Sequence, residues 1–147
     1  MQERHKPDII NIYTTAEEAP RAHWLAIIID VFRAFSVECY ILSNEAKYII
    51  PVQTLEEAHT LKKGNPEYIL IGERWWMKPE WFDYGNSPTE LLNVDFTDKI
   101  IVHTTMNGTK GLILATEADE VITGSFVNAS AILRYIEANK IKTISLV

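Results

Sequence analysis

The sequence predicts an α/β fold in three layers, with a mostly parallel sheet and helices on both of its faces. Short, nearly continuous apolar runs alternate along the chain with segments of helical periodicity. Apolar strands of this kind are typical of a sheet covered on both faces, and their alternation with helices is typical of parallel βαβ units. Because such crossovers are right-handed, the loops that follow the strands are expected along one edge of the sheet.

The individual elements follow from the apolar runs and from helix-start signals. Strands are expected at residues 9–13, 25–30, 47–52, 68–72, 99–105, 120–125 and 143–147. Helices are expected at residues 34–44, 54–64, 87–92, 108–118 and 128–140. Thr54 and Glu57 have the spacing of a capping box, in which side chain and backbone exchange hydrogen bonds. Ser87, Pro88 and Glu90 predict a similar start for the short third helix.

Composition limits the class of protein. With 147 residues, 47% of them hydrophobic, the chain is expected to form one domain over residues 1–147 with a substantial core. Truncation at the C-terminus stays open, because nothing follows the last predicted strand. The net charge of -6 argues against a nucleic-acid partner, and the single Cys39 excludes an internal disulfide. No apolar run approaches a membrane span and no signal peptide is visible, so a soluble cytoplasmic protein is expected.

Polar segments follow several of the expected strands and lead into helices. They are "DVFRAFS", "GERWW", "TTMNGT" and "GSFVNAS". Ligands bind at the carboxyl ends of the strands in open α/β sheets, and free N–H groups at helix starts attract anions. The pattern therefore predicts an anion-binding site at this edge.

Two interpretations stay open for the charged residues after the second strand. Arg33 is suited to bind a phosphate or sulfonate with its planar fork of donors, but it is equally suited to pair with Asp30 or Glu38. Asp30 offers a hard oxygen ligand for Mg²⁺, although an aspartate at this point more commonly caps the next helix.

Hydroxyl and amide side chains are concentrated in "TTMNGT", namely Thr104, Thr105, Asn107 and Thr109. Gly108 lets the backbone approach a ligand closely, which favours anion binding. The alternative is a simple Asn-Gly turn with Thr109 as a helix cap, and the segment is not a Walker motif because "GK[ST]" does not occur. In "GSFVNAS", Ser125 and Asn128 are suited to bind a ligand, and the alternative is that Asn128 caps the last helix.

The long segment "GERWWMKPEWFDYGNSP" holds Glu73, Arg74 and Asp83 among three tryptophans. Its carboxylates suit Mg²⁺ and its cations suit an anionic substrate. A loop of this length in a compact domain is more often functional than idle, while exposed tryptophan favours a protein interface.

Taken in order, these segments resemble the 2-phosphosulfolactate phosphatase family. The resemblance rests on "INIYTTAEEA", "IDVFRAFS", "IIPVQTLEEA", "GER" followed by "FDYGNSP", "TTMNGT" and "GSFVNASA". It implies a Mg²⁺-dependent enzyme that removes phosphate from 2-phosphosulfolactate, giving sulfolactate, on the route to coenzyme M. By this resemblance the polar site residues fall on Asp30, Arg33, Ser36, Glu73, Arg74, Asp83, Asn86, Ser87, Thr104, Thr105, Asn107, Thr109, Ser125 and Asn128.

The leading hypothesis assigns roles within this set. Asp30, Glu73 and Asp83 are the expected catalytic residues and the ligands of Mg²⁺, which would polarise the phosphoryl group and a water molecule. Arg33, Arg74 and the other polar residues are expected to bind the substrate and to stabilise the phosphoryl charge as it redistributes. The expected partner is a small anionic phosphoester, with no nucleic acid and no membrane, and a homo-oligomer is a further possibility.

The sequence departs from the family pattern in the long segment. Trp75 and Trp76 stand where the family usually has glycines, and Trp81 stands where another is expected. Indole groups at these positions would narrow, close or retune the pocket. Family members are also longer than this chain. The rival hypothesis is therefore a catalytically inactive anion-binding or assembly module that uses the Trp-rich loop as its interface.

Overall fold

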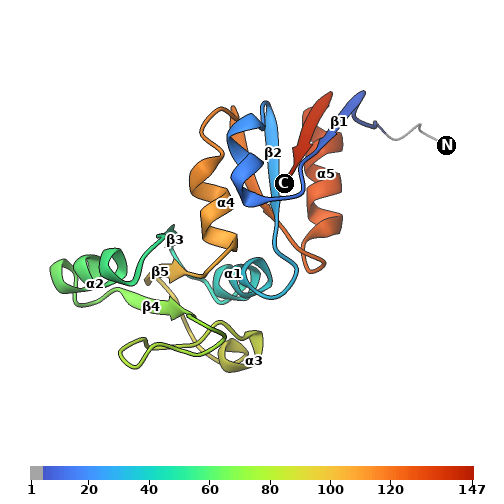
Figure 1. Cartoon of the computed structure of the whole chain (residues 1–147). Coiled ribbons are helices and arrows are strands. Elements are labelled where there is room, and N and C mark those ends of the chain that lie inside the picture. The colour runs from blue at the N-terminus through green and yellow to red at the C-terminus, as the bar shows by residue number, and fades with distance from the viewer. Residues whose placement is uncertain (1–4) are drawn as a thin grey trace.

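The computed structural model describes residues 5–147 and shows strands alternating with helices (Figure 1). The strands are β1 (Ile9–Ile12), β2 (Leu25–Ile29), β3 (Tyr48–Pro51), β4 (Ile69–Gly72), β5 (Ile100–Thr104), β6 (Glu120–Gly124) and β7 (Thr143–Leu146). The α-helices are α1 (Ala34–Ser43), α2 (Leu55–Gly64), α3 (Pro88–Leu91), α4 (Gly108–Leu114) and α5 (Ala129–Asn139), and a 3-10 helix η1 (Ala16–Arg21) lies between β1 and β2. All the strand pairs of both sheets are parallel, so the α/β class is confirmed.

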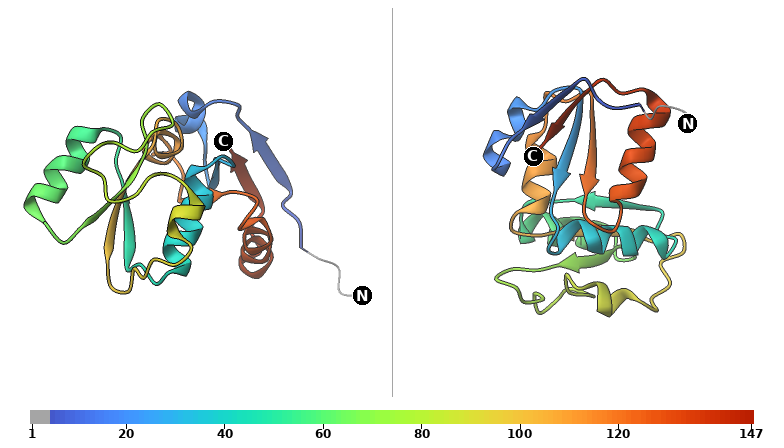
Figure 2. Two further views of the ribbon diagram at one scale, coloured as in Figure 1. Left: turned by 90° about the horizontal axis from the view of Figure 1, so that it is seen from below. Right: turned by 90° about the vertical axis from the view of Figure 1, so that its right-hand side faces the viewer.

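The strands form two sheets, whereas the sequence pattern had suggested a continuous one. One sheet has the order β1-β7-β2-β6 and the other has the order β3-β5-β4. Helix α1 runs across the junction between them (Figure 2). Ala34 and Phe35 of α1 belong to the core beside β2, whereas Val37 and Ile41 belong to the core of the three-stranded sheet. A helix with apolar residues on two sides can pack against two sheets. The spacing of apolar residues along the sequence does not show how many sheets the helix contacts.

Helices cover both faces of the four-stranded sheet. Ala19 of η1 and Ala115, which follows α4, pack with Ile28 of β2 on one face. On the other face Ile136 of α5 packs against Ile27 of β2 and neighbouring apolar side chains. This arrangement of helix, sheet and helix is the predicted three-layer architecture.

The two predicted helix starts have different outcomes. At α2 the Glu57 N–H donates to Thr54 Oγ1 at 3.1 Å and the Thr54 N–H donates to the Glu57 carboxylate at 3.2 Å, which confirms the capping box. At α3 the predicted box is wrong, because Glu90 accepts from the Gly85 N–H at 2.8 Å and the Ser87 hydroxyl pairs with that of Thr89. Within residues 5–147, no helix has both the length and the apolar character needed to cross a membrane.

Candidate active site

The carboxyl ends of β2, β4 and β5 converge on a cavity of about 240 Å³. It is lined by Asp30, Phe32, Arg33, Glu73, Trp75, Trp76, Asn86, Thr105, Met106 and Asn107. Pockets for drug-sized ligands commonly have volumes of roughly 300–1,000 Å³, so this cavity suits a smaller molecule. The predicted convergence of polar loops is therefore present, even though the loops come from two sheets.

Asp30 lies half-buried where β2 ends. Burial raises the pKa of its carboxyl group above the ordinary value, and the carboxylates of Glu38 and Glu73 act in the same direction. A hydrogen bond from the Ala34 amide and the proximity of His103 oppose the rise in this pKa. A desolvated carboxylate close to other carboxylates is a favourable place for a cation.

The start of α4 packs directly against Asp30. A Cβ atom built on Gly108 would lie 2.8 Å from Asp30 Oδ2 and 2.8 Å from Ala34 Cβ, so only glycine fits without a shift. Arg33, half-buried immediately before α1, also lines the cavity. In the part of the chain that the structure describes, Arg33 forms no ion pair with Asp30 or Glu38. Its guanidinium is therefore available to an anion.

Glu73 joins two of the loops that line the cavity. Its Oε2 accepts from the Trp76 N–H at 2.9 Å, and its Oε1 accepts from the Met106 N–H at 3.1 Å. The residue is buried and lines the cavity, as predicted for a site residue. Its two backbone contacts also give it a structural role that the sequence pattern did not indicate.

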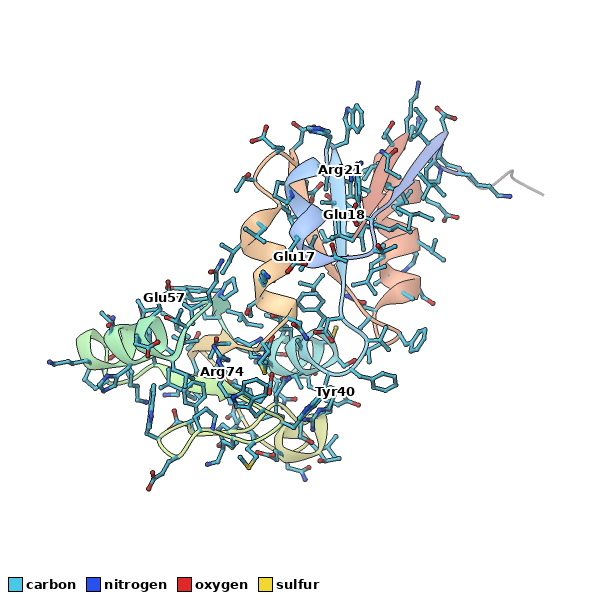
Figure 3. The ribbon with its side chains drawn as sticks, viewed as in Figure 1. Glu17, Glu18, Arg21, Tyr40, Glu57 and Arg74 are labelled. Atoms are coloured by element: carbon cyan, nitrogen blue, oxygen red, sulfur yellow. The ribbon has the colours of Figure 1, made fainter. Side chains whose placement is uncertain are left out.

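Arg74 does not line the cavity. Its guanidinium donates to the carbonyl oxygens of Glu73 at 2.6 Å and Gln53 at 2.7 Å, and to Thr104 Oγ1 at 2.7 Å. It lies beside β4 and β5, as Figure 3 shows, and burial lowers its pKa. Arg74 therefore connects the residues that end or follow β3, β4 and β5, and it is not one of the lining residues.

Asp83 also lies away from the cavity. Its carboxylate accepts from the Leu70 N–H at 2.8 Å and lies 3.4 Å from Lys62 Nζ. Because β4 is an edge strand, Asp83 satisfies a backbone donor that β5 does not reach. The structure thus does not bring Asp83 together with Asp30 and Glu73. No group of three or more His, Cys, Asp or Glu side chains suited to a metal occurs within residues 5–147.

The remaining predicted residues divide between the cavity and the turns around it. Asn86, Thr105 and Asn107 line the cavity. Thr109 is fully buried and donates its hydroxyl hydrogen bond to the Thr105 carbonyl oxygen at 3.1 Å, which steadies the start of α4. Ser36 donates to the Val31 carbonyl oxygen at 3.2 Å and is not one of the lining residues.

Ser125 and Asn128 close the turn between β6 and α5 and do not line the cavity. The Ser125 N–H donates to Asn128 Oδ1 at 2.8 Å, and Asn128 Nδ2 donates to the Thr123 carbonyl oxygen at 2.8 Å. Ser87, paired with Thr89, lies beside the lining residue Asn86 but does not itself line the cavity. Asn128 and Ser87 are the N-cap residues of α5 and α3, but neither side chain makes the expected capping hydrogen bond, because Asn128 bonds within the turn and Ser87 pairs with Thr89.

Comparison with known proteins identifies the family to which this chain belongs. The family model described as 2-phosphosulpholactate phosphatase matches residues 11–147. The chain belongs to the 2-phosphosulfolactate phosphatase family. A probable 2-phosphosulfolactate phosphatase of Thermotoga petrophila is 44% identical over 115 residues, which are 78% of this chain and 49% of the relative. One of Thermoplasma acidophilum is 35% identical over 114 residues, which are 78% of this chain and 51% of the relative. The chain thus spans about half the length of these curated relatives.

The two tryptophans that depart from the 2-phosphosulfolactate phosphatase pattern form the tip of a tight turn. Arg74 and Met77 exchange backbone hydrogen bonds of 2.9 and 3.1 Å, and between them Trp75 and Trp76 have φ angles of 52° and 68°. A two-residue turn with both central residues in the left-handed region strongly favours glycine. Glycine would therefore adopt this turn with less strain than tryptophan at both positions. Both indoles are exposed, by 73% and 77%, and both line the cavity.

Two buried side chains beneath the cavity were missed by the sequence analysis. His103 of β5 is fully buried, with Nδ1 3.0 Å from Glu38 Oε1 and Nε2 3.3 Å from Asn86 Oδ1. The resemblance to 2-phosphosulfolactate phosphatases did not indicate Glu38 or His103 as site residues. One available signal was a histidine inside the otherwise apolar run that forms β5, because a buried polar side chain requires partners.

Proposed function

We propose that this protein is a Mg²⁺-dependent phosphatase that hydrolyses a small anionic phosphoester. The observation that carries the proposal is the convergence of Asp30, Arg33, Glu73 and Asn107, from the ends of three strands, on one small cavity. Relatives are named as probable 2-phosphosulfolactate phosphatases, so the proposed reaction converts 2-phosphosulfolactate to sulfolactate and phosphate. The proposed setting is coenzyme M biosynthesis in the cytoplasm.

The side chains that line the cavity fit Mg²⁺ with few protein ligands. Mg²⁺ usually keeps several waters and binds through one or two carboxylates together with substrate phosphate oxygens. Asp30 is the best placed ligand, because both Glu73 oxygens already accept backbone hydrogen bonds and Asp83 lies elsewhere. Glu73 would then accept hydrogen bonds from water molecules that are bound to the ion. When bound, Mg²⁺ would supply polarisation of the phosphoryl oxygen and of a water molecule.

Arg33 and the amides of Asn86 and Asn107 are the proposed donors to the phosphoryl oxygens. A guanidinium presents two parallel N–H groups to a phosphate, and such charge-assisted bonds are stronger than neutral ones. All three residues line the cavity with Asp30 and Glu73, so donors and carboxylates face the same space. Arg33 would neutralise charge that otherwise opposes the approach of an anion to two carboxylates.

A second candidate function is supported by the exposed turn at the mouth of the cavity. Trp75, Trp76 and Met77 are 73%, 77% and 69% exposed. Tryptophan and methionine are enriched in protein interfaces, so this turn also suits an assembly module that forms a homo-oligomer. In that case the turn would be covered in the assembly and catalysis would be absent.

Phosphate release from 2-phosphosulfolactate and from simple phosphoesters, measured with and without Mg²⁺, tests the proposal. The native chain should show Mg²⁺-dependent release. Arg33→Gln should reduce it roughly 10- to 100-fold, which corresponds to the loss of hydrogen bonds to a charged group. Arg134→Gln is the matched control, since Arg134 is exposed on α5 outside the cavity.

A folded native chain that releases no phosphate from any of these esters with Mg²⁺ present would remove the enzymatic assignment. If light scattering then showed an oligomer that dissociates when Trp75 and Trp76 are replaced, the assembly function would replace it.

A further inference from the structure

Asn86 presents a donor to the cavity that no residue in the described part of the chain uses. The residue is 6% exposed and lines the cavity. Its Oδ1 is 3.3 Å from His103 Nε2, whereas its Nδ2 makes no hydrogen bond within residues 5–147. Every fully buried side-chain nitrogen or oxygen in those residues has a partner, so Nδ2 must be accessible. The accessible part of a residue buried to this degree is the part that faces the cavity.

A connected set of polar side chains fixes this orientation. Because the amide oxygen only accepts, His103 must donate from Nε2 to Asn86. The opposite ring nitrogen, Nδ1, lies 3.0 Å from Oε1 of Glu38, which is itself 6% exposed. His103 is on β5, Glu38 is on α1, and Asn86 precedes α3, so three separate elements meet in this set.

We propose that Glu38 and His103 are positioning residues that turn the amide nitrogen of Asn86 toward the bound anion. The inference rests on the proposed function, since it assumes that a phosphoryl group enters the cavity. In this arrangement both ring nitrogens donate, Nδ1 to the Glu38 carboxylate and Nε2 to Asn86 Oδ1. Asn86 Nδ2 is then the amide atom that faces a phosphoryl oxygen.

The opposite amide orientation would hinder binding. Rotation of the Asn86 amide by half a turn would place Oδ1 beside the phosphoryl oxygens, where two acceptors repel each other. The cavity already contains the carboxylates of Asp30 and Glu73, so an additional acceptor would be especially unfavourable. An asparagine free in solution adopts either orientation. A fixed N–H donor beneath it selects one of them at no cost during binding.

Calorimetric titration with inorganic phosphate, at constant Mg²⁺, separates the positioning role from a purely structural one. His103→Leu removes the donor to Asn86, and the affinity for phosphate should fall roughly 10-fold or more. His103→Gln retains a side-chain N–H and should restore most of the affinity. Phosphate affinity in His103→Leu equal to that of the native chain would overturn the inference.

A second measurement remains decisive if His103→Leu fails to fold. Long-range ¹H–¹⁵N correlation spectra of the native chain report whether the Nε2 atom of His103 carries a proton. A protonated Nε2 is the expected result, and an Nε2 without a proton would overturn the assigned orientation of Asn86. If the native chain binds no phosphate, the proposed function fails, while this spectrum still decides the orientation.

Discussion

Replacing both tryptophans of the turn by glycine is expected to stabilise the protein. Trp75 and Trp76 have φ angles of 52° and 68°, in the left-handed region that is unfavourable for side chains with a Cβ atom. Their side chains are 73% and 77% exposed, so truncation removes little buried apolar surface. The double variant W75G/W76G therefore loses conformational strain without a comparable loss of packing.

The expected size of the effect follows from two opposing terms. A residue other than glycine in the left-handed conformation costs about 1–2 kcal/mol. Glycine offsets roughly 0.5–1 kcal/mol of this gain in stability, because an unfolded chain with glycine has more conformational freedom to lose on folding. The net gain is about 0.5–1 kcal/mol at each position, or roughly 1–2 kcal/mol for the double variant. For a chain of this size that corresponds to an increase in Tm of about 3–6 °C.

Thermal and urea unfolding followed by circular dichroism measure this change. Met77→Gly is the matched control, because Met77 is 69% exposed in the same turn but lies outside the left-handed region. The Met77→Gly variant should lose about 0.5–1 kcal/mol of unfolding free energy. A double variant that is less stable than the native chain would refute the strain argument. It would show that the indoles make stabilising contacts that outweigh their backbone conformation.

Three further predictions concern the helix starts, a close backbone contact and the half-buried carboxyl group of Asp30. Thr54→Ala should cost about 1 kcal/mol in urea unfolding, whereas Ser87→Ala should change stability by less than about 0.5 kcal/mol because Ser87 makes no capping bond. Gly72→Ala should lower the free energy of unfolding by about 3 kcal/mol or more, since its Cβ atom would lie 2.1 Å from the backbone oxygen of Thr104. Gly64→Ala is the control, because a Cβ atom there meets nothing within 4 Å and should be tolerated. Burial raises the pKa of Asp30, so native stability should fall as pH rises from its unfolded value through its folded value. Asp30→Asn should lack that fall in unfolding free energy while losing phosphatase activity.

The order of elements was largely predictable because it depends on local patterns. Apolar runs set the strands, and the Thr54–Glu57 capping box set the start of α2, as observed. The 3-10 helix η1 was not predicted, since "AEEAPR" contains a proline and lacks the apolar spacing of a packed helix. The division into two sheets was missed for a different reason. It depends on which strands pair, and pairing is a property of the whole chain.

The location of a candidate site residue was predictable where it follows from a place at a strand end. Asp30, Arg33 and Asn107 fall into this class, and all three line the cavity. Arg74 and Asp83 have equally suitable chemistry, but backbone groups near the edges of the three-stranded sheet occupy them. A sequence does not show which polar side chains form hydrogen bonds with backbone groups of the same fold.

The cavity depends on contact between the two sheets, which makes that contact part of the site. Asp30 extends from β2 of one sheet, whereas Glu73 and Thr105 extend from β4 and β5 of the other. One close connection is at Gly108, where an added Cβ atom would reach Asp30 and Ala34 at 2.8 Å each. Because Gly108 follows β5 and Asp30 follows β2, a side chain at residue 108 would separate the two halves of the cavity. Close packing between the two sheets therefore lies where carboxylates and donors from different sheets must remain in register to hold one small anion.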